Sequence, residues 1–187
     1  MSKRTLVITF GVIELVTSAM IAVRPFGVKN TQATPAAVQS EDKDNQELAR
    51  LFQEDQSDRT SEENIDWRVV GPRDKTRQAR VKELCRGDLL NTGADYYHAA
   101  MVLQHAEAPG DYLLAHELCV VAIAKGNQDA KWLAAASEDR FLMSIGRPQR
   151  FGTQYQAEGP HGEFKLYRME NGVTGGMRAA MDVPAPK

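Results

Sequence analysis

The stretch DYLLAHELCVVAIAK, residues 111–125, decides the fold that we expect for this chain. Its apolar residues occupy positions nearly all round the helix that it would form, and a helix of that kind is usually buried. Pro109 stands near the first turn and Gly126 follows the end, which are favoured places for proline and glycine at helix termini. We therefore predict that residues 109–125 form the central and most buried helix.

Four more helices are expected on the two sides of this one. Apolar residues recur at helical spacing over residues 46–55, 74–86, 94–107 and 128–145. A glycine that can end a helix follows the second and the fourth of these segments. The short connections between the segments are typical of antiparallel neighbours in a helical bundle.

The pattern changes after residue 150. Residues 163–168, EFKLYR, fit a short strand or hairpin arm, and the rest of the tail from about residue 155 is expected to be irregular. The expected fold class is mainly α: a compact antiparallel bundle of about five helices with an irregular or short β C-terminal tail.

The composition is that of one folded domain with accessory segments. The chain has 187 residues, of which 42% are hydrophobic and 26% charged, and it has two cysteines. These values exclude collagen-like, disulfide-scaffold and wholly disordered proteins. The formal net charge of −2 gives no general basic footprint, so no nucleic-acid partner is expected.

Residues 1–23 have the pattern of a signal peptide or signal anchor. Lys3 and Arg4 precede a long apolar stretch that only Glu14 interrupts with a charge. The positive charges favour a cytoplasmic N-terminus with the rest of the chain exported or anchored to the cytoplasmic membrane, its domain outside the cytoplasm. The alternative is a buried N-terminal helix of a soluble protein.

A linker is expected to separate this segment from the folded domain. Residues 24–43 are rich in Pro, Ser, Thr, Gln and Ala and have no apolar period. Residues 1–43 hold five Lys/Arg and three Asp/Glu (net +2), whereas residues 44–187 hold 18 and 22 (net −4). We therefore expect a single, mildly acidic helical domain over residues 44–187.

Several expected helices carry charged or imidazole side chains on their apolar faces. Such groups are costly to bury unless they are paired and hydrogen-bonded. We predict one shared polar cluster, over which the segment QRFGTQ, residues 149–154, folds back. The helical members of this cluster are expected to be Asp55, Asp74, Arg77, His98, His105, Asp139 and Arg140.

His105 is the candidate catalytic acid/base residue of this cluster. Asp139 would orient it, and Arg140 would clamp an anionic group or stabilise developing negative charge. The candidate ligand contacts are Gln104, Gln149, Thr153, Gln154, Asp74 and Arg77.

A structural interpretation of the same residues stays open. His105 would then be a core histidine satisfied by Asp139 or by a backbone carbonyl. Asp139 and Arg140 would belong to ion pairs that join helices, and residues 149–154 would satisfy helix ends. The pairs Asp55/Arg59 and Asp74/Arg77 would be local salt bridges.

We expect neither a metal site nor a cofactor. His98, His105, His116 and Asp139 are metal-ligating types, but no tight ligand motif such as H-E-x-x-H occurs. No Gly-rich phosphate loop or nucleophile elbow is present in the sequence. The two cysteines lie in expected helices and form at most one disulfide; the sequence leaves open whether they meet.

An ordered set of motifs resembles a bacterial domain-of-unknown-function family with the signature Q-H … D-R … Q-x-[YF]-G-T-Q. The resemblance covers about residues 46–154 and implies a mostly helical domain, often in exported proteins, without an established activity. The usual acidic residue after Gln-His is displaced here, where Ala106-Glu107 stands. The motifs are Glu47-Leu48, Asp55-Gln56, Arg59, Asp74-x-x-Arg77, Gln104-His105, Asp139-Arg140 and Gln149-x-Phe151-Gly152-Thr153-Gln154.

The sequence therefore predicts an exported or membrane-anchored helical domain that binds a small ligand or a protein partner through the polar cluster. The membrane would be contacted through the N-terminal segment if it is not cleaved. The alternative is a hydrolase-like enzyme that uses His105 with Asp139 and Arg140. In a third interpretation the cluster only fixes the packing of the helices. A concave, solvent-reachable pocket on which His105 and Arg140 converge would favour the first two, and a fully buried, mutually satisfied network the third.

Overall fold

The computed structural model describes residues 43–60, 65–157 and 164–186. The predicted signal segment 1–23 and nearly all of the predicted linker lie outside these residues. The described part is mostly helical with one small sheet, so the predicted mainly α fold is confirmed. Its elements are α1 (Gln46–Ser57), α2 (Trp67–Arg86), α3 (Gly93–Leu103), α4 (Pro109–Ala124), α5 (Ala130–Ser144), β1 (Tyr155–Ala157), β2 (Phe164–Leu166) and α6 (Gly175–Ala180).

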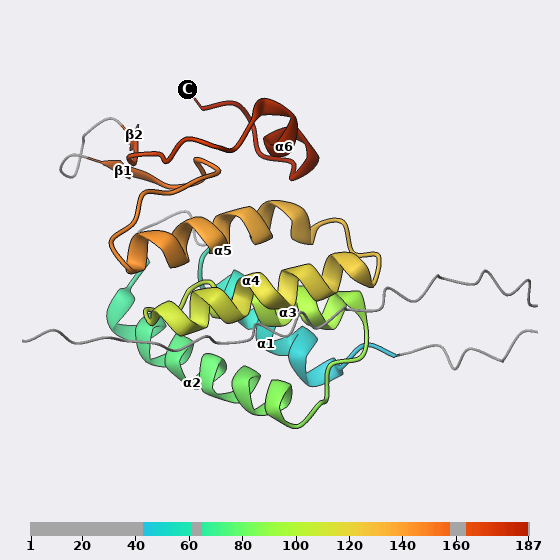
Figure 1. Ribbon diagram of the computed structural model, residues 1–187. Helices are drawn as coiled ribbons and strands as arrows, with labels where there is room; N and C mark the ends of the chain where they lie inside the picture. Colours follow the sequence, from blue (N-terminus) through green and yellow to red (C-terminus); the bar gives the residue numbers. More distant parts are fainter. Residues whose placement is uncertain (1–42, 61–64, 158–163, 187) are drawn as a thin grey trace, which may run out of the picture. The chain divides into compact units, whose positions relative to one another are not determined.

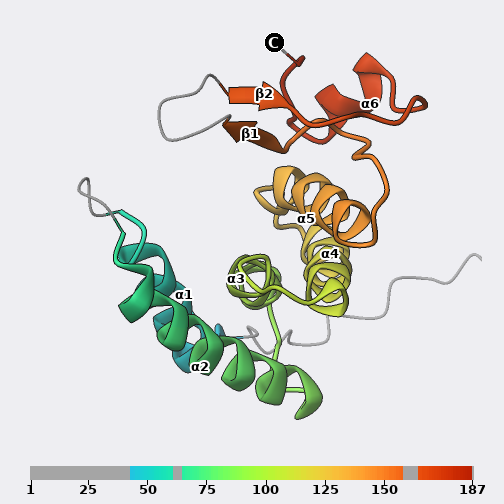
Figure 2. The ribbon, with the colours of Figure 1, turned by 90° about the vertical axis from the view of Figure 1, so that its left-hand side faces the viewer.

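Helices α3, α4 and α5 pack in sequence order, whereas α1 and α2 both pack on α3 and on each other. Helix α4 packs between α3 and α5, and α3 also contacts α1 and α2 (Figures 1 and 2). The core between them is built from small and medium-sized apolar side chains. It includes Leu48, Leu51, Val81, Leu84, Val102, Leu103, Leu118, Ala122 and Leu133.

The N-terminal end of the domain is held by side-chain caps. Asn45 caps α1 by accepting a hydrogen bond from the backbone N–H of Leu48, and Thr92 caps α3 in a reciprocal capping box with Asp95. The buried carboxylate of Asp95 also accepts from the backbone N–H of Asn45, at 2.8 Å. One carboxylate therefore links the starts of two helices.

Helix α2 begins at Trp67, seven residues before the predicted start at Asp74. Asp66 caps it, and the helix passes through Gly71 and Pro72. Glycine and proline are the poorest helix formers, and Pro72 cannot donate to the carbonyl four residues earlier. For this reason the sequence pattern did not predict the first two turns of this helix.

The prediction that α4 is the most buried helix is wrong. Leu113, Val120 and Val121 of α4 are exposed, and its buried residues are those that face α3 and α5. Helix α5 is more deeply buried, with Ala134, Ala135 and their neighbours at nearly zero exposure. The reason is that the C-terminal segment packs against α5, whereas no described element covers the outward face of α4.

The C-terminal segment is more ordered than the predicted tail. Strands β1 and β2 pair antiparallel, as expected of a hairpin arm, and α6 follows them. Phe151 and Val183 pack on Ala135 of α5, and Arg178 of α6 donates a 2.8 Å hydrogen bond to the carbonyl oxygen of Phe151. Helix α6 was not predicted because it has only six residues and opens with two glycines.

Candidate functional site

The predicted polar residues form two separate networks instead of one shared cluster. The first network lies between α1 and α2, and the second joins α5 to the segment 149–154. No hydrogen bond or ion pair connects the two networks within the residues that the structure describes. The roles predicted for their members therefore have to be considered separately.

The first network, the Asp55 network, is centred on a fully buried carboxylate of α1. Asp55 accepts a hydrogen bond from Arg59 at 2.9 Å, and Arg59 also binds Asp74 at 2.7 Å. Arg77 of α2 binds Asp74 at 2.6 Å and Asp58 at 2.8 Å. The predicted pairs Asp55/Arg59 and Asp74/Arg77 are thus confirmed as salt bridges. The same arginines also join the two helices, through Arg59–Asp74 and Arg77–Asp58.

In this network, ion pairing offsets the cost of burying the charged groups. Burial works to lower the pKa of Arg77, but its hydrogen bonds with Asp74 and Asp58 raise that pKa overall. Burial likewise works to raise the pKa of Asp58, and the guanidinium groups of Arg77 and Arg73 lower it instead. Each buried charge therefore has the opposite charge beside it, as a stable buried network requires.

His105, which follows the end of α3, joins the rim of the Asp55 network. Its Nδ1 lies 3.2 Å from Oδ1 and 3.1 Å from Oδ2 of Asp55. An ionised carboxylate only accepts hydrogen bonds, so we assign the proton to Nδ1. In the neutral ring Nε2 is then the acceptor. It makes no hydrogen bond with a described residue, and the side chain is 18% exposed.

The second network, the Asp139 network, fixes the segment after α5. The buried carboxylate of Asp139 accepts from the backbone N–H groups of Arg150, Phe151 and Thr153 and from the hydroxyl of Thr153, at 2.7–3.0 Å. Four donors satisfy its oxygens, so Asp139 does not orient His105. Its predicted role is therefore corrected: Asp55 is the carboxylate beside the histidine.

The amide side chains of this segment are also used internally. The fully buried Gln149 donates to the carbonyl oxygens of Gln154 and Tyr167, both at 3.0 Å, and accepts from the N–H of Gln154 at 2.9 Å. Gln154 donates to the hydroxyl of Thr153. The structural interpretation of residues 149–154 therefore accounts for these contacts without a ligand.

Arg140 and Gln104 belong to neither network. Burial lowers the pKa of the half-buried Arg140 guanidinium, and the neighbouring Tyr112 side chain of α4 counteracts this effect. Nε of Arg140 and Oε1 of Gln104 are buried and have no hydrogen-bond partner among the described residues. Gln104 directs its amide nitrogen to the sulfur of Met101, at 2.9 Å.

A pocket of about 620 Å³ opens beside His105, and we call it the His105 pocket. One wall is the first half of α2, and the other is the connection from α3 into the first turn of α4. The volume falls in the range of small-molecule sites. The residues that line it include Trp67, Gly71 and Lys75 of α2 and, on the opposite wall, His105, Glu107 and Asp111.

Sequence reasoning missed most of this wall. Trp67 lies seven residues before the predicted start of α2, so it was not placed on any helix face. It is 60% exposed, which is unusual for a tryptophan. The available signal was the spacing of Trp67, Gly71 and Lys75 at four-residue intervals, which puts them on one helix face.

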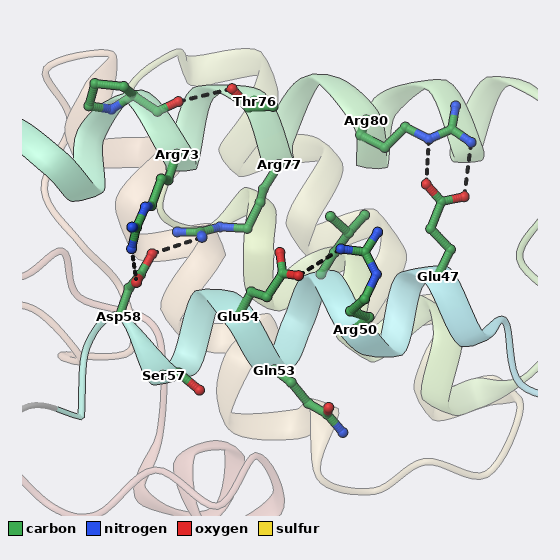
Figure 3. A pocket seen from close by; sticks show the side chains of 12 residues that line it. Glu47, Arg50, Gln53, Glu54, Ser57, Asp58, Arg73, Thr76, Arg77 and Arg80 are labelled. Carbon is green, nitrogen blue, oxygen red and sulfur yellow. Dashed lines mark hydrogen bonds and ion pairs between the residues drawn. The ribbon is translucent and has the colours of Figure 1, made fainter.

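A second hollow, the α1–α2 groove, has a volume of about 940 Å³. Figure 3 shows arginines of both helices along it. Each of these arginines is already paired with a carboxylate (Arg50 with Glu54, Arg73 and Arg77 with Asp58, and Arg80 with Glu47, at 2.6–2.9 Å). The groove is larger than the His105 pocket, but the three arginines of α2 bind carboxylates of the α1 side and so hold the two helices together.

Metal ligands and thiols do not converge in the described part of the chain. No group of three or more His, Cys, Asp or Glu side chains is placed to hold a metal ion there. Cys85 and Cys119 are both free, which answers the question that the sequence left open. Burial raises the pKa of Cys119 to about 12, so this thiol is not a nucleophile at neutral pH.

No known protein family, no curated protein and no solved structure matches this chain. The resemblance to the bacterial family with the Q-H, D-R and Q-x-[YF]-G-T-Q signature therefore stays a prediction.

Proposed function

We propose that this domain binds a small ligand in the His105 pocket. The observation that carries the proposal is the state of His105: its Nδ1 is fixed by the buried Asp55, and its ring lines a solvent-reachable pocket. A histidine held in one tautomer presents a defined acceptor to a ligand. The Asp139 network, by contrast, has its hydrogen-bonding groups satisfied by the chain itself.

The local sequence of α2 supports a functional role for this wall. Gly71 and Pro72 stand inside a 20-residue helix, where they lower its stability, and both line the pocket. A Cβ atom added to Gly71 meets nothing within 4 Å, so packing does not explain the glycine. Residues that break a local rule without a packing reason concentrate at functional sites.

The test compares ligand binding by two histidine variants. The full-length protein is screened by thermal shift against a panel of small amines, carboxylates, amino acids, sugars and nucleotides, with His105→Gln beside His116→Gln. His116 binds the carbonyl oxygen of Ala134 between α4 and α5 and is not in the pocket, so it is the matched control. We expect hits that His105→Gln loses and His116→Gln keeps. A panel without any hit, or hits unaffected by His105→Gln, would contradict the proposal.

Acid/base catalysis is the second candidate function. The specific support is the carboxylate–histidine pair itself, because a buried Asp at Nδ1 leaves Nε2 free to exchange a proton with a substrate. This version replaces Asp139 by Asp55 as the positioning residue, and it does not include Arg140. A hydrolase screen of wild type against His105→Gln tests it: turnover that the variant loses at unchanged stability supports an enzyme.

We also propose that the domain works outside the cytoplasm, delivered or anchored by residues 1–23. The support is the sequence pattern of Lys3, Arg4 and the apolar stretch after them. Within residues 43–60, 65–157 and 164–186, none of the helices is long and apolar enough for a membrane span. Protease accessibility of the domain in intact cells, with Edman sequencing of its N-terminus, tests the location and any cleavage.

A further inference from the structure

We propose that the ligand of the His105 pocket is a small zwitterion, with an ammonium group at one end and a carboxylate at the other. This inference rests on the proposed function and adds the chemical class of the ligand. The pocket wall holds two charged side chains of opposite sign without a partner among the described residues, with apolar surface between them.

Most charges of the wall are already neutralised by the protein. Asp74 binds Arg59 and Arg77, and Asp111 binds Lys82 at 3.0 Å. Because each of these carboxylates is already paired with a cation of the protein, it attracts a cationic ligand only weakly. Asp55 lies behind His105 and is likewise committed to Arg59.

Two charges of opposite sign are left. Lys75 and Glu107 make no hydrogen bond or ion pair within the part of the chain that the structure describes. Lys75 belongs to α2, and Glu107 lies in the connection between α3 and α4, so the two come from the two walls. A ligand that neutralises both needs an anionic and a cationic group, and a dianion or dication would meet one charge of its own sign.

The surface between the two charges suits a short apolar body. Trp67, Gly71 and Lys75 follow one another along one face of α2, and the glycine leaves open space where any other residue would project. The exposed indole of Trp67 offers a flat apolar surface at the same wall. His105 adds one acceptor, Nε2, which can receive a hydrogen bond from an ammonium group.

The experiment uses four probes that share a five-carbon chain: 5-aminovalerate, cadaverine, glutarate and 1,5-pentanediol. The full-length protein carries Trp132→Phe, which leaves Trp67 as its single tryptophan, because the chain has two. Fluorescence titrations at low salt then report binding at the pocket wall. If Trp132→Phe lowers stability, the indole N–H signal of Trp67 in the NMR spectrum of the unsubstituted chain follows the same titrations.

We expect 5-aminovalerate to bind at least about fivefold more tightly than each of the other three probes. Lys75→Gln should weaken 5-aminovalerate and glutarate but not cadaverine, and Glu107→Gln should weaken 5-aminovalerate and cadaverine but not glutarate. Lys131→Gln and Glu117→Gln, which change the same residue types away from the pocket, should have no effect.

Two results would overturn the inference. Tighter binding of cadaverine, glutarate or pentanediol would reject the zwitterion while leaving the pocket as a binding site. No binding by any of the four would also reject it, and the His105-dependent hits of the larger panel would then decide separately whether the proposed function stands.

Discussion

The imidazole of His105 contacts the carboxylate of Asp55, fifty residues earlier in the chain, with Nδ1 only 3.1 Å from Oδ2. The contact ties the end of α3 to the last turn of α1 and to the arginines around Asp55. A change at this carboxylate should therefore affect both the fold and the pocket.

Replacing Asp55 by Asn should lower the free energy of unfolding by about 1.5–3 kcal/mol, because Arg59 and His105 lose a charged acceptor while Arg59 and Arg77 keep Asp74 as their counter-charge. Urea unfolding followed by circular dichroism measures the loss. The matched control is Glu54→Gln, which breaks the exposed Arg50–Glu54 pair of 2.6 Å in the same helix. That change should cost less than about 1 kcal/mol. If both variants lost the same free energy of unfolding, the buried Asp55 network would contribute no more to stability than an exposed surface pair.

Much of this architecture could be predicted from sequence periodicity. The helical segments around Leu48, Val81, Val102 and Leu133 were found because each buries one regular face. The buried polar positions Asp55, Asp74 and Arg77 were found for the same reason, since they interrupt apolar faces.

The partners of those polar residues could not be predicted. Helix periodicity shows that a side chain faces inward but not which neighbouring helix it meets. The sequence pattern therefore predicts Asp139 as the partner of His105, whereas the packing of α3 against α1 places His105 on Asp55. The wall with Trp67 was missed because Gly71 and Pro72 weaken the helical pattern that would have shown it.

Replacing Asp139 by Asn should release the segment 149–154 from α5. The amide group supplies one acceptor oxygen and an NH2 group with two N–H donors where four donors now converge, so we expect a loss of about 2–4 kcal/mol. Hydrogen exchange should speed up at the N–H groups of Phe151 and Thr153 but not in α1. Glu138→Gln, which breaks a half-exposed pair with Arg150, is the control and should leave that exchange nearly unchanged.

Gly71→Ala should stabilise the protein by about 0.5–1 kcal/mol. Alanine is the better helix former, and the added Cβ meets nothing within 4 Å. Gly71→Leu should block ligand binding at the His105 pocket without unfolding the helix. Gly152→Ala is the contrasting variant, because Gly152 has a φ of +79° and its Cβ would lie 3.0 Å from Arg178. Thermal unfolding should move in opposite directions for the two alanine variants.

The stability of the domain should fall as the pH drops below about 6.5 because of His98. Its ring stacks on Phe52 with centroids 4.3 Å apart, its buried Nδ1 has no described partner, and burial lowers its pKa from the usual 6.5. The folded state then binds the proton less readily than the unfolded state, so the stability is present above about pH 6.5 and is lost as the pH falls through the lowered pKa.

His98→Phe keeps a ring on Phe52 and removes the titrating group. Its free energy of unfolding should therefore depend less on pH in this window than that of the wild type, with His116→Gln as the control. The negative charges of Asp95 and Asp44 raise the pKa of His98 and so oppose the larger effect of burial. An unchanged pH slope in His98→Phe would assign the dependence to other groups.

The folded domain should begin at residues 43–45. The side chain of Asp44 accepts from the hydroxyl of Thr92 at 2.7 Å, and Asn45 both caps α1 and donates from its side chain to the carbonyl oxygen of Leu89 at 3.0 Å. A chain truncated to start at Lys43 should therefore keep the melting temperature of the full-length domain within a few degrees. A chain that starts at Glu47 loses these contacts and the N-cap, and it should be less stable by at least about 1 kcal/mol. Differential scanning calorimetry of the two chains measures this difference, and equal stability would place the true boundary later in the sequence.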